Sequence, residues 1–139
     1  MNNIYKNIIK DETQKILAEL KKGTTVEEFN PMLMSLFNKQ VQPFLISWIQ
    51  YNPQIEIAKL NIPILIVNGS KDIQVKNIDA ELLHKAAENS ELFIVKNMNH
   101  IFKEINGDLT ENMQSYNNPN LPIMSSFSDK INTFIKDLK

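Results

Sequence analysis

The 139-residue sequence contains no cysteine and only three glycines, at positions 23, 69 and 107. The lack of cysteine excludes a disulfide framework and a thiolate metal site. No apolar stretch is long enough to cross a bilayer as a helix. The first fifteen residues, MNNIYKNIIKDETQK, also lack the apolar core of a secretory signal peptide. We therefore expect no membrane span, and the sequence as given favours a cytoplasmic location.

Basic and acidic side chains are nearly equal in number. The chain has 15 basic and 16 acidic side chains, for a formal net charge of -1. A surface balanced in this way does not attract nucleic acid or an anionic membrane, so neither is expected as a partner. Hydrophobic residues make up 42% and charged residues 22% of the chain, which are ordinary values for a globular protein of one domain.

Residues 1–60 are predicted to be helical, because they contain no convincing strand. Between residues 4 and 22, isoleucine and leucine recur mostly on one helical face. Gly23 supplies a stop for this first helix. Residues 25–28, Thr-Val-Glu-Glu, have the spacing of a capping box and predict the start of a second helix. Pro31 could instead begin a new helix.

Two further helices are expected in this part of the chain. One covers about residues 43–50 and contains Phe44 and Trp48, whose apolar cluster we expect to be core rather than a ligand pocket. The other begins at Asn52-Pro53, an N-cap followed by proline at the first helical position, and runs to about Leu60.

The pattern changes at Asn61, and residues 61–139 are predicted to form a βαβα arrangement. Residues 62–67 are a continuous, mostly β-branched apolar run, typical of a strand that is buried on both faces of a parallel sheet. A helix is predicted over 79–89 and a second strand over 91–96. Strand, helix and strand at this spacing indicate a βαβ unit with a right-handed crossover. The fold class is therefore α/β.

The end of the chain is predicted to be a loop followed by a helix. Residues 103–124 hold two prolines, one glycine and several asparagines without a clear period, which favours a long surface loop. The last helix is expected over about 128–138, with Ser126 or Ser128 as its N-cap. Its apolar stripe would consist of Ile131, Phe134, Ile135 and Leu138.

Two polar residues follow the two predicted strands. Asp72 comes just after the first strand, and His100 comes just after the second. The carboxyl ends of neighbouring parallel strands lie at one edge of the sheet, where open α/β sheets bind their ligands, so we expect these two side chains to meet. A carboxylate there can accept a hydrogen bond from one imidazole nitrogen and fix the tautomer. The other nitrogen is then free to take a proton from a hydroxyl.

Each of these residues has a plainer interpretation when it is taken alone. An aspartate after a strand is usually a turn or helix-capping residue, and a histidine in a loop is commonly just solvated. The joint placement of Asp72 and His100 favours the functional interpretation. His84, the only other histidine, falls inside a predicted helix and is expected to be a surface or half-buried side chain. With two histidines and no carboxylate cluster beside them, a metal-dependent enzyme is disfavoured.

The sequence resembles bacterial α/β-hydrolases, most nearly those related to serine aminopeptidases and lysophospholipase-like esterases, from about residue 40 to the end. The stretches that carry the resemblance are Gln42–Trp48, Ile57–Leu60, Ile62–Gly69, Asp72, Val75 and Met98–His100. The resemblance implies that Asp72 is the orienting acid, His100 the general base, and Gly69 the turn glycine ahead of the acid. Residues 1–60 would then be a helical segment similar to a cap, and residues 61–139 the C-terminal part of the hydrolase core.

The nucleophile of that family has no counterpart in this sequence. It belongs to a Gly-x-Ser-x-Gly elbow upstream of the cap, and none of the three glycines begins such a motif. The loop of the oxyanion hole and the earlier strands have no counterpart either. The resemblance therefore implies part of a serine hydrolase, as a truncated reading frame, a proteolytic remnant or one half of a split protein. We expect the chain alone to be inactive.

The resemblance implies a small-molecule ester or amide as the substrate of the full-length protein, and no cofactor. The alternative is a non-enzymatic interaction module, or a complementing half of a split protein. Two apolar parallel strands leave edges and faces that pair with other chains. Self-association is therefore expected, most simply as a twofold homodimer.

Overall fold

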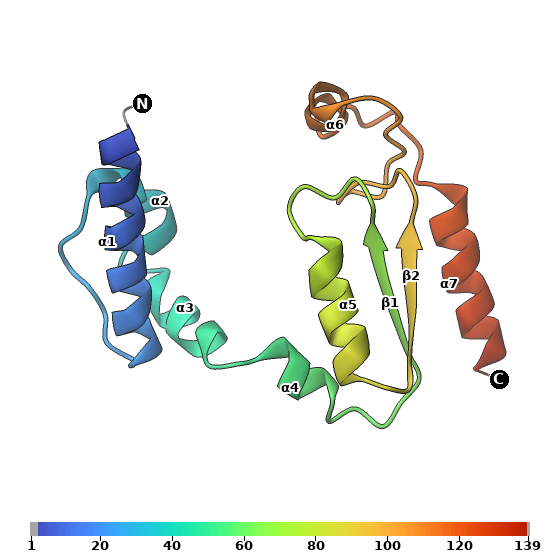
Figure 1. Cartoon of the computed structure of the whole chain (residues 1–139), viewed down its shortest axis with the longest axis horizontal. Helices are drawn as coiled ribbons and strands as arrows, with labels where there is room; N and C mark the ends of the chain where they lie inside the picture. Colours follow the sequence, from blue (N-terminus) through green and yellow to red (C-terminus); the bar gives the residue numbers. More distant parts are fainter. Residues whose placement is uncertain (1–2, 139) are drawn as a thin grey trace. The chain divides into compact units, whose positions relative to one another are not determined.

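The computed structural model describes the backbone of residues 3–138 and the side chains of residues 6–138. It divides into two compact units, Met1–Asn52 and Pro53–Lys139. The first unit is helical, and the second combines helices with a pair of strands (Figure 1).

The first unit is organised around the apolar side of its long N-terminal helix. Ile16 and Leu20 pack with Leu33 and Phe37, and all four side chains are at most 4% exposed. Gly23, with a φ of 83°, ends the helix as predicted. The helices of this unit are α1 (Asn3–Lys21), the short 3₁₀ helix η1 (Pro31–Leu33), α2 (Met34–Phe37) and α3 (Gln42–Ile49).

The helix predicted from residue 25 does not form, and residues 24–30 are irregular. The side-chain amide of Gln42, which is fully buried, binds both backbone groups of Val26, each at 2.7 Å. Glu12 accepts a hydrogen bond from the backbone N–H of Asn30 at 2.6 Å. The prediction was wrong because these tertiary hydrogen bonds take the backbone groups that a helix would pair. The next helical turn begins at Pro31, the alternative start, behind an Asn30 cap.

Two aromatic residues of α3 lie on the surface of the first unit. Phe44 and Trp48 are 63% and 66% exposed, and their rings stack on each other with centroids 6.0 Å apart. Their neighbours Leu45 and Ile46 face the core instead. The expectation of a buried cluster was therefore wrong for the two aromatics. Residues four apart share one helical face, and that face of α3 is not the one that packs inward.

The second unit is a mixed α/β unit whose two strands run in parallel, which confirms the predicted class. Ile64 lies opposite Ser90, and Gly69 lies opposite Val95. The strand pair lies between α5 and α7 in Figure 1. The elements of this unit are α4 (Pro53–Ile57), β1 (Ile64–Gly69), α5 (Asn77–Ala86), β2 (Ser90–Val95), α6 (Leu109–Ser115) and α7 (Ser125–Asp137).

The bounds of β1 differ from the predicted 62–67 for a local reason at each end. Pro63 has no backbone N–H to donate to the ladder, so the strand begins after it. At the other end the pairing continues through Asn68 and Gly69, which lie opposite Ile94 and Val95. The division of the chain also falls earlier than the pattern change at Asn61, because α4 packs against α5 and belongs to the second unit.

Helix α6 lies inside the segment that the sequence predicts to be a loop, so that prediction was wrong. Asp108 caps the helix by accepting hydrogen bonds from the N–H groups of Thr110 and Glu111, at 2.9 and 3.2 Å. The buried residues of α6 are Asn112 and Ser115, which are both polar. The helix was not predicted because the residues on its inward face are polar, so apolar residues do not recur at helical spacing.

Helix α7 begins at Ser125, before the predicted start, and its N-cap position is Met124 rather than a serine. The N–H of Met124 donates to the carbonyl of Phe102 at 2.9 Å, and the ring of Phe127 stacks on that of Phe102 with centroids 4.5 Å apart. Contacts with the loop after β2, rather than a local cap, therefore fix where this helix begins.

Gly69 is the position where β1 and the segment after β2 come closest. A Cβ atom built on Gly69 would lie 2.6 Å from the carbonyl carbon of Met98, and closer still to its oxygen. Both obstructing atoms belong to the backbone, so no side-chain movement relieves the overlap.

We expect Gly69→Ala to lower the free energy of unfolding by about 2 kcal/mol or more, because one extra methyl group would force the two strand ends apart. Urea denaturation measures this change. Gly107→Ala is the matched control, since a Cβ there meets only the flexible carboxylate of Glu111. Equal stability of Gly69→Ala and wild type would contradict the close approach.

Candidate active site

The two residues singled out from the sequence meet at the carboxyl ends of the strands. Asp72 lies in the loop after β1, and His100 lies in the loop after β2. The Nδ1 atom of His100 is 3.0 Å from the Oδ2 atom of Asp72, within hydrogen-bond reach. The parallel pairing of β1 with β2 produces this contact, because it puts both loops at one edge of the sheet.

The two loops are joined by further hydrogen bonds just beyond the strands. The N–H of Ser70 donates to the carbonyl of Val95 at 3.0 Å, and the N–H of Lys71 donates to that of Met98 at 2.9 Å. The N–H of Asn97 in turn donates to the Ser70 hydroxyl at 2.8 Å. These hydrogen bonds connect the backbone on both sides of the Asp72–His100 dyad in addition to the side-chain contact itself.

The carboxylate of Asp72 uses its two oxygens for different tasks. Oδ1 accepts hydrogen bonds from the N–H groups of Gln74 and Val75, at 2.8 and 2.9 Å, and so closes the turn after β1. Oδ2 faces His100. The side chain is 6% exposed. Asp72 is thus a turn residue, as the plainer interpretation had it, and also the partner of the histidine.

The environment of Asp72 favours its ionised form. Burial by itself would raise the pKa of the carboxyl, but the hydrogen bonds from Val75, His100 and Gln74, together with the charge of His100, lower this pKa below its ordinary value. An ionised carboxylate only accepts hydrogen bonds, so Nδ1 of His100 must be the donor. The neutral ring then carries its proton on Nδ1 and leaves Nε2 as an acceptor.

The ring of His100 is accessible from outside. Its side chain is 38% exposed, and among residues 6–138 none forms a hydrogen bond with Nε2. An imidazole oriented in this way can take a proton from a hydroxyl placed next to Nε2.

A pocket of about 240 Å³ lies beside this dyad. Asp72, His100, Asn68 and Phe102 are among the residues that line it. Asn68 is 7% exposed, and its Oδ1 atom has no hydrogen-bond partner in the described part of the chain. The volume is below the range of roughly 300–1,000 Å³ that is usual for small-molecule sites, so the pocket would take only a small group.

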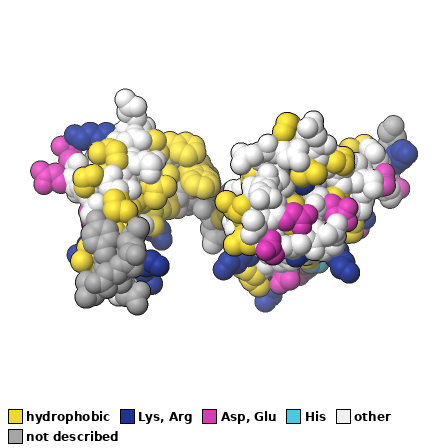
Figure 2. Space-filling view, turned by 90° about the horizontal axis from the view of Figure 1, so that it is seen from above, with side chains coloured by type: hydrophobic (Ala, Val, Ile, Leu, Met, Phe, Trp, Pro, Cys, Tyr) yellow, Lys and Arg dark blue, Asp and Glu magenta, His cyan; other side chains and the backbone are white. Residues whose placement is uncertain are grey.

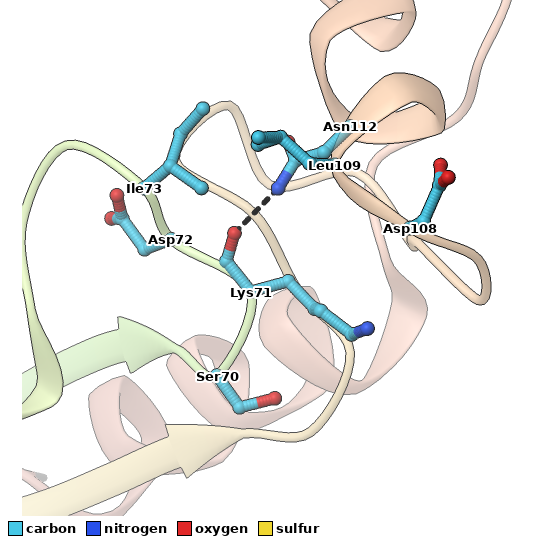
Figure 3. Close-up of a pocket in the computed structure, with 7 residues that line it drawn as sticks. All are labelled: Ser70, Lys71, Asp72, Ile73, Asp108, Leu109 and Asn112. Carbon is cyan, nitrogen blue, oxygen red and sulfur yellow. Dashed lines mark hydrogen bonds between the residues drawn. The ribbon is translucent and has the colours of Figure 1, made fainter.

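A second pocket lies on the other side of the Asp72 loop, where α6 approaches it (Figure 3). The side-chain amide of Asn112 donates to the carbonyl of Lys71 at 2.6 Å across this pocket. Lys71 Nζ donates to the carbonyl of Gly107 at 3.0 Å, and Asp108 caps α6. In Figure 3 the carboxylate of Asp72 points away from Asn112. Asp72 lines both pockets, whereas His100 lines only the first of these two.

Sequence reasoning missed three buried polar residues beside the dyad. Asn99, Asn112 and Ser115 are 1%, 2% and 3% exposed and form hydrogen bonds with one another. For Asn112 and Ser115 the one available signal was the abundance of asparagine after His100, which favoured a loop.

His84 lies away from the site, at the other end of the strands. It is half-buried, with Nδ1 2.8 Å from the hydroxyl of Ser90. That hydroxyl donates to the carbonyl of Ala87 at 2.6 Å, so it accepts from His84 rather than being deprotonated by it. This second histidine–serine pair therefore tethers α5 to the start of β2.

In the described part of the chain, no three histidine and carboxylate side chains gather so as to hold a metal ion. None of the described helices has the length and apolarity to cross a bilayer. Comparison of the chain with models of known protein families gives no match, and comparison with curated proteins gives none either. A functional assignment must therefore rest on the residues and their geometry.

The lowered pKa of Asp72 predicts a pH dependence of stability. In the unfolded chain an aspartate has its ordinary pKa of about 3.9, so the unfolded state binds a proton first as the pH falls. The stabilisation by Asp72 is fully present above that value and is lost as the pH falls through the lower pKa of the folded state.

We expect Asp72→Asn to reduce the fall in unfolding free energy between pH 6 and pH 3, measured by urea denaturation at each pH. Asp129→Asn, which removes an exposed carboxylate of α7, is the matched control and should leave that fall as in the wild type. The same fall in Asp72→Asn and wild type would show that the carboxylate gains nothing from its partners.

Proposed function

We propose that this chain supplies the orienting acid and the general base of a serine hydrolase of the α/β-hydrolase type, acting on small-molecule esters or amides. The observation that supports the proposal is the hydrogen bond between Asp72 and His100 at the ends of two parallel strands. The serine nucleophile and the oxyanion hole would come from a segment outside this sequence.

In this mechanism His100 moves one proton, and Asp72 orients His100. Nε2 of His100 accepts the proton of the serine hydroxyl as the serine oxygen attacks the acyl carbon. The imidazolium then gives that proton to the leaving alcohol or amine. Asp72 holds the ring through Nδ1 and stabilises its positive charge. Water repeats the same steps to release the acyl group.

Ser70, which lies in the Asp72 loop, does not fit the role of nucleophile. The hydroxyl of Ser70 accepts a hydrogen bond from the N–H of Asn97, and Ser70 lines the pocket on the α6 side of the Asp72 loop. It also lacks the Gly-x-Ser-x-Gly context that exposes a nucleophile on a tight turn. We therefore propose that the chain alone does not hydrolyse esters.

The coding sequence upstream of residue 1 tests this proposal. We expect it to encode a Gly-x-Ser-x-Gly segment, and we expect the two segments together to react with a fluorophosphonate probe and to turn over a short-chain p-nitrophenyl ester. His100→Ala and Asp72→Asn should each reduce turnover by roughly 10⁴-fold, because triad members act as a unit.

Two controls accompany this experiment. His84→Ala should retain activity, because its ring serves Ser90 and not the dyad. The purified chain alone should not exceed the buffer rate. An unrelated upstream sequence, or ester turnover by the chain alone that His100→Ala abolishes, would contradict the proposal.

A second candidate function is a self-associating interaction module. In the described part of the chain the sheet has two strands only, so each strand has one edge without a strand partner. Apolar side chains of this unit also face outward, and Figure 2 shows such side chains on its surface. Among the exposed ones are Ile55 (57%), Ile62 (58%), Leu109 (62%) and Met113 (55%). Edges and surfaces of this kind pair with other chains.

We therefore expect the purified chain to form a twofold dimer. Light scattering over a range of concentrations should give twice the mass of the 16.1 kDa chain at the upper end. A monomer at every concentration would count against this second function and would leave the hydrolase proposal untouched.

A further inference from the structure

Helix α6 has an inverted distribution of side chains. Its buried residues are the polar Asn112 and Ser115, whereas Leu109 and Met113 are 62% and 55% exposed. A helix normally docks through an apolar stripe. Hydrogen bonds, rather than apolar packing, therefore fix this helix against the loops that carry Asp72 and His100.

Asn99 is the neighbour of His100 in the chain, and all of its hydrogen-bonding capacity is used. Its Oδ1 atom accepts from the N–H groups of Ile101 and Lys103, at 3.1 and 2.9 Å. Its Nδ2 atom donates to Asn112 Oδ1 and to Ser115 Oγ, at 3.1 and 2.8 Å. A rotated amide would face two N–H donors with its own N–H groups, so the orientation of this side chain is determined. It holds the backbone that follows His100 in place.

Asn112 links the two halves of the dyad. Its Oδ1 atom accepts from Asn99, next to His100, while its Nδ2 atom donates to the carbonyl of Lys71, next to Asp72. Figure 3 shows this second bond reaching from α6 to the Asp72 loop. One buried side chain of α6 thus contacts the residue before the acid and the residue before the base.

We propose that Asn112 is a positioning residue that holds Asp72 and His100 at hydrogen-bonding distance through Lys71 and Asn99. The inference rests on the proposed function, because it assigns a role in setting the geometry of that dyad. Loss of the Asn112 amide leaves an N–H of the buried Asn99 and the carbonyl of Lys71 without these partners. The two loops would then move to find water, and the contact between Asp72 and His100 would loosen.

The tautomer of His100 reports this contact directly and requires no nucleophile. In the wild type the neutral ring should carry its proton on Nδ1, facing the carboxylate. A histidine ring without that contact shifts towards the Nε2–H form, which the free histidine side chain prefers in water. Long-range ¹H–¹⁵N spectra of the labelled chain resolve the two forms. His84, the only other histidine, serves as an internal reference.

We expect Asn112→Ala to lower the ratio of Nδ1–H to Nε2–H for His100 by about tenfold, which corresponds to about 1.4 kcal/mol of lost preference. The signals of His84 should not change. Met113→Ala, which removes an exposed side chain from the same helix, is the matched control and should leave the ratio at its wild-type value.

A folded Asn112→Ala chain with an unchanged ratio would overturn the inference. If that variant does not fold, Ser115→Ala decides the matter, because it keeps the Asn112 amide and removes one acceptor of Asn99 and one donor to the backbone carbonyl of Asn112. A smaller fall in the ratio then supports the inference, and no fall overturns it. Because the spectra are recorded on the chain alone, failure of the hydrolase proposal and failure of this inference are separate results.

Discussion

Asp72 and His100 meet because β1 and β2 are immediate neighbours that run in the same direction. A carboxylate and an imidazole that are 28 positions apart in sequence would otherwise meet only at a large cost in chain entropy. The packing of α5 on both strands offsets that cost and brings both strand ends to one edge. Gly69 makes the approach close enough, since a side chain there would overlap the backbone of Met98. Every other feature of the site depends on this pairing.

The strand pair and the loops beyond its carboxyl ends are stabilised by different mixtures of interactions. Along the sheet, apolar residues such as Ile66 and Val95 are buried, as is usual for a parallel pair. Beyond the carboxyl ends, buried amides and a hydroxyl form hydrogen bonds beside buried apolar side chains such as Met98 and Ile105. Hydrogen bonds have direction, so a satisfied polar network defines one arrangement of loops more narrowly than apolar contacts do. The directionality of these hydrogen bonds helps to hold the imidazole of His100 in one orientation.

Asp72 shows how a residue can be structural and functional at the same time. One oxygen closes the turn through Gln74 and Val75, and the other orients His100. Because the turn holds the Oδ1 atom, it also fixes the direction in which the Oδ2 atom faces His100. Phe102, held at a φ of 63°, bends the loop after His100 in a conformation that bulky residues rarely adopt. Its stacking on Phe127 offsets part of that strain.

The sequence by itself determined the α/β class, the two parallel strands and the residues at their ends. Continuous apolar runs and their spacing predict the strands from local sequence alone. Asp72 and His100 could be located because each follows one of these runs. Only the tertiary structure decided the course of residues 24–30, the outward placement of Phe44 and Trp48, and the existence of α6. In each case long-range hydrogen bonds or the choice of packing face overrode the local pattern. Asn112 is the clearest instance: its two partners come from distant loops, and a polar residue buried on the inner face of a helix leaves no periodic signal in the sequence.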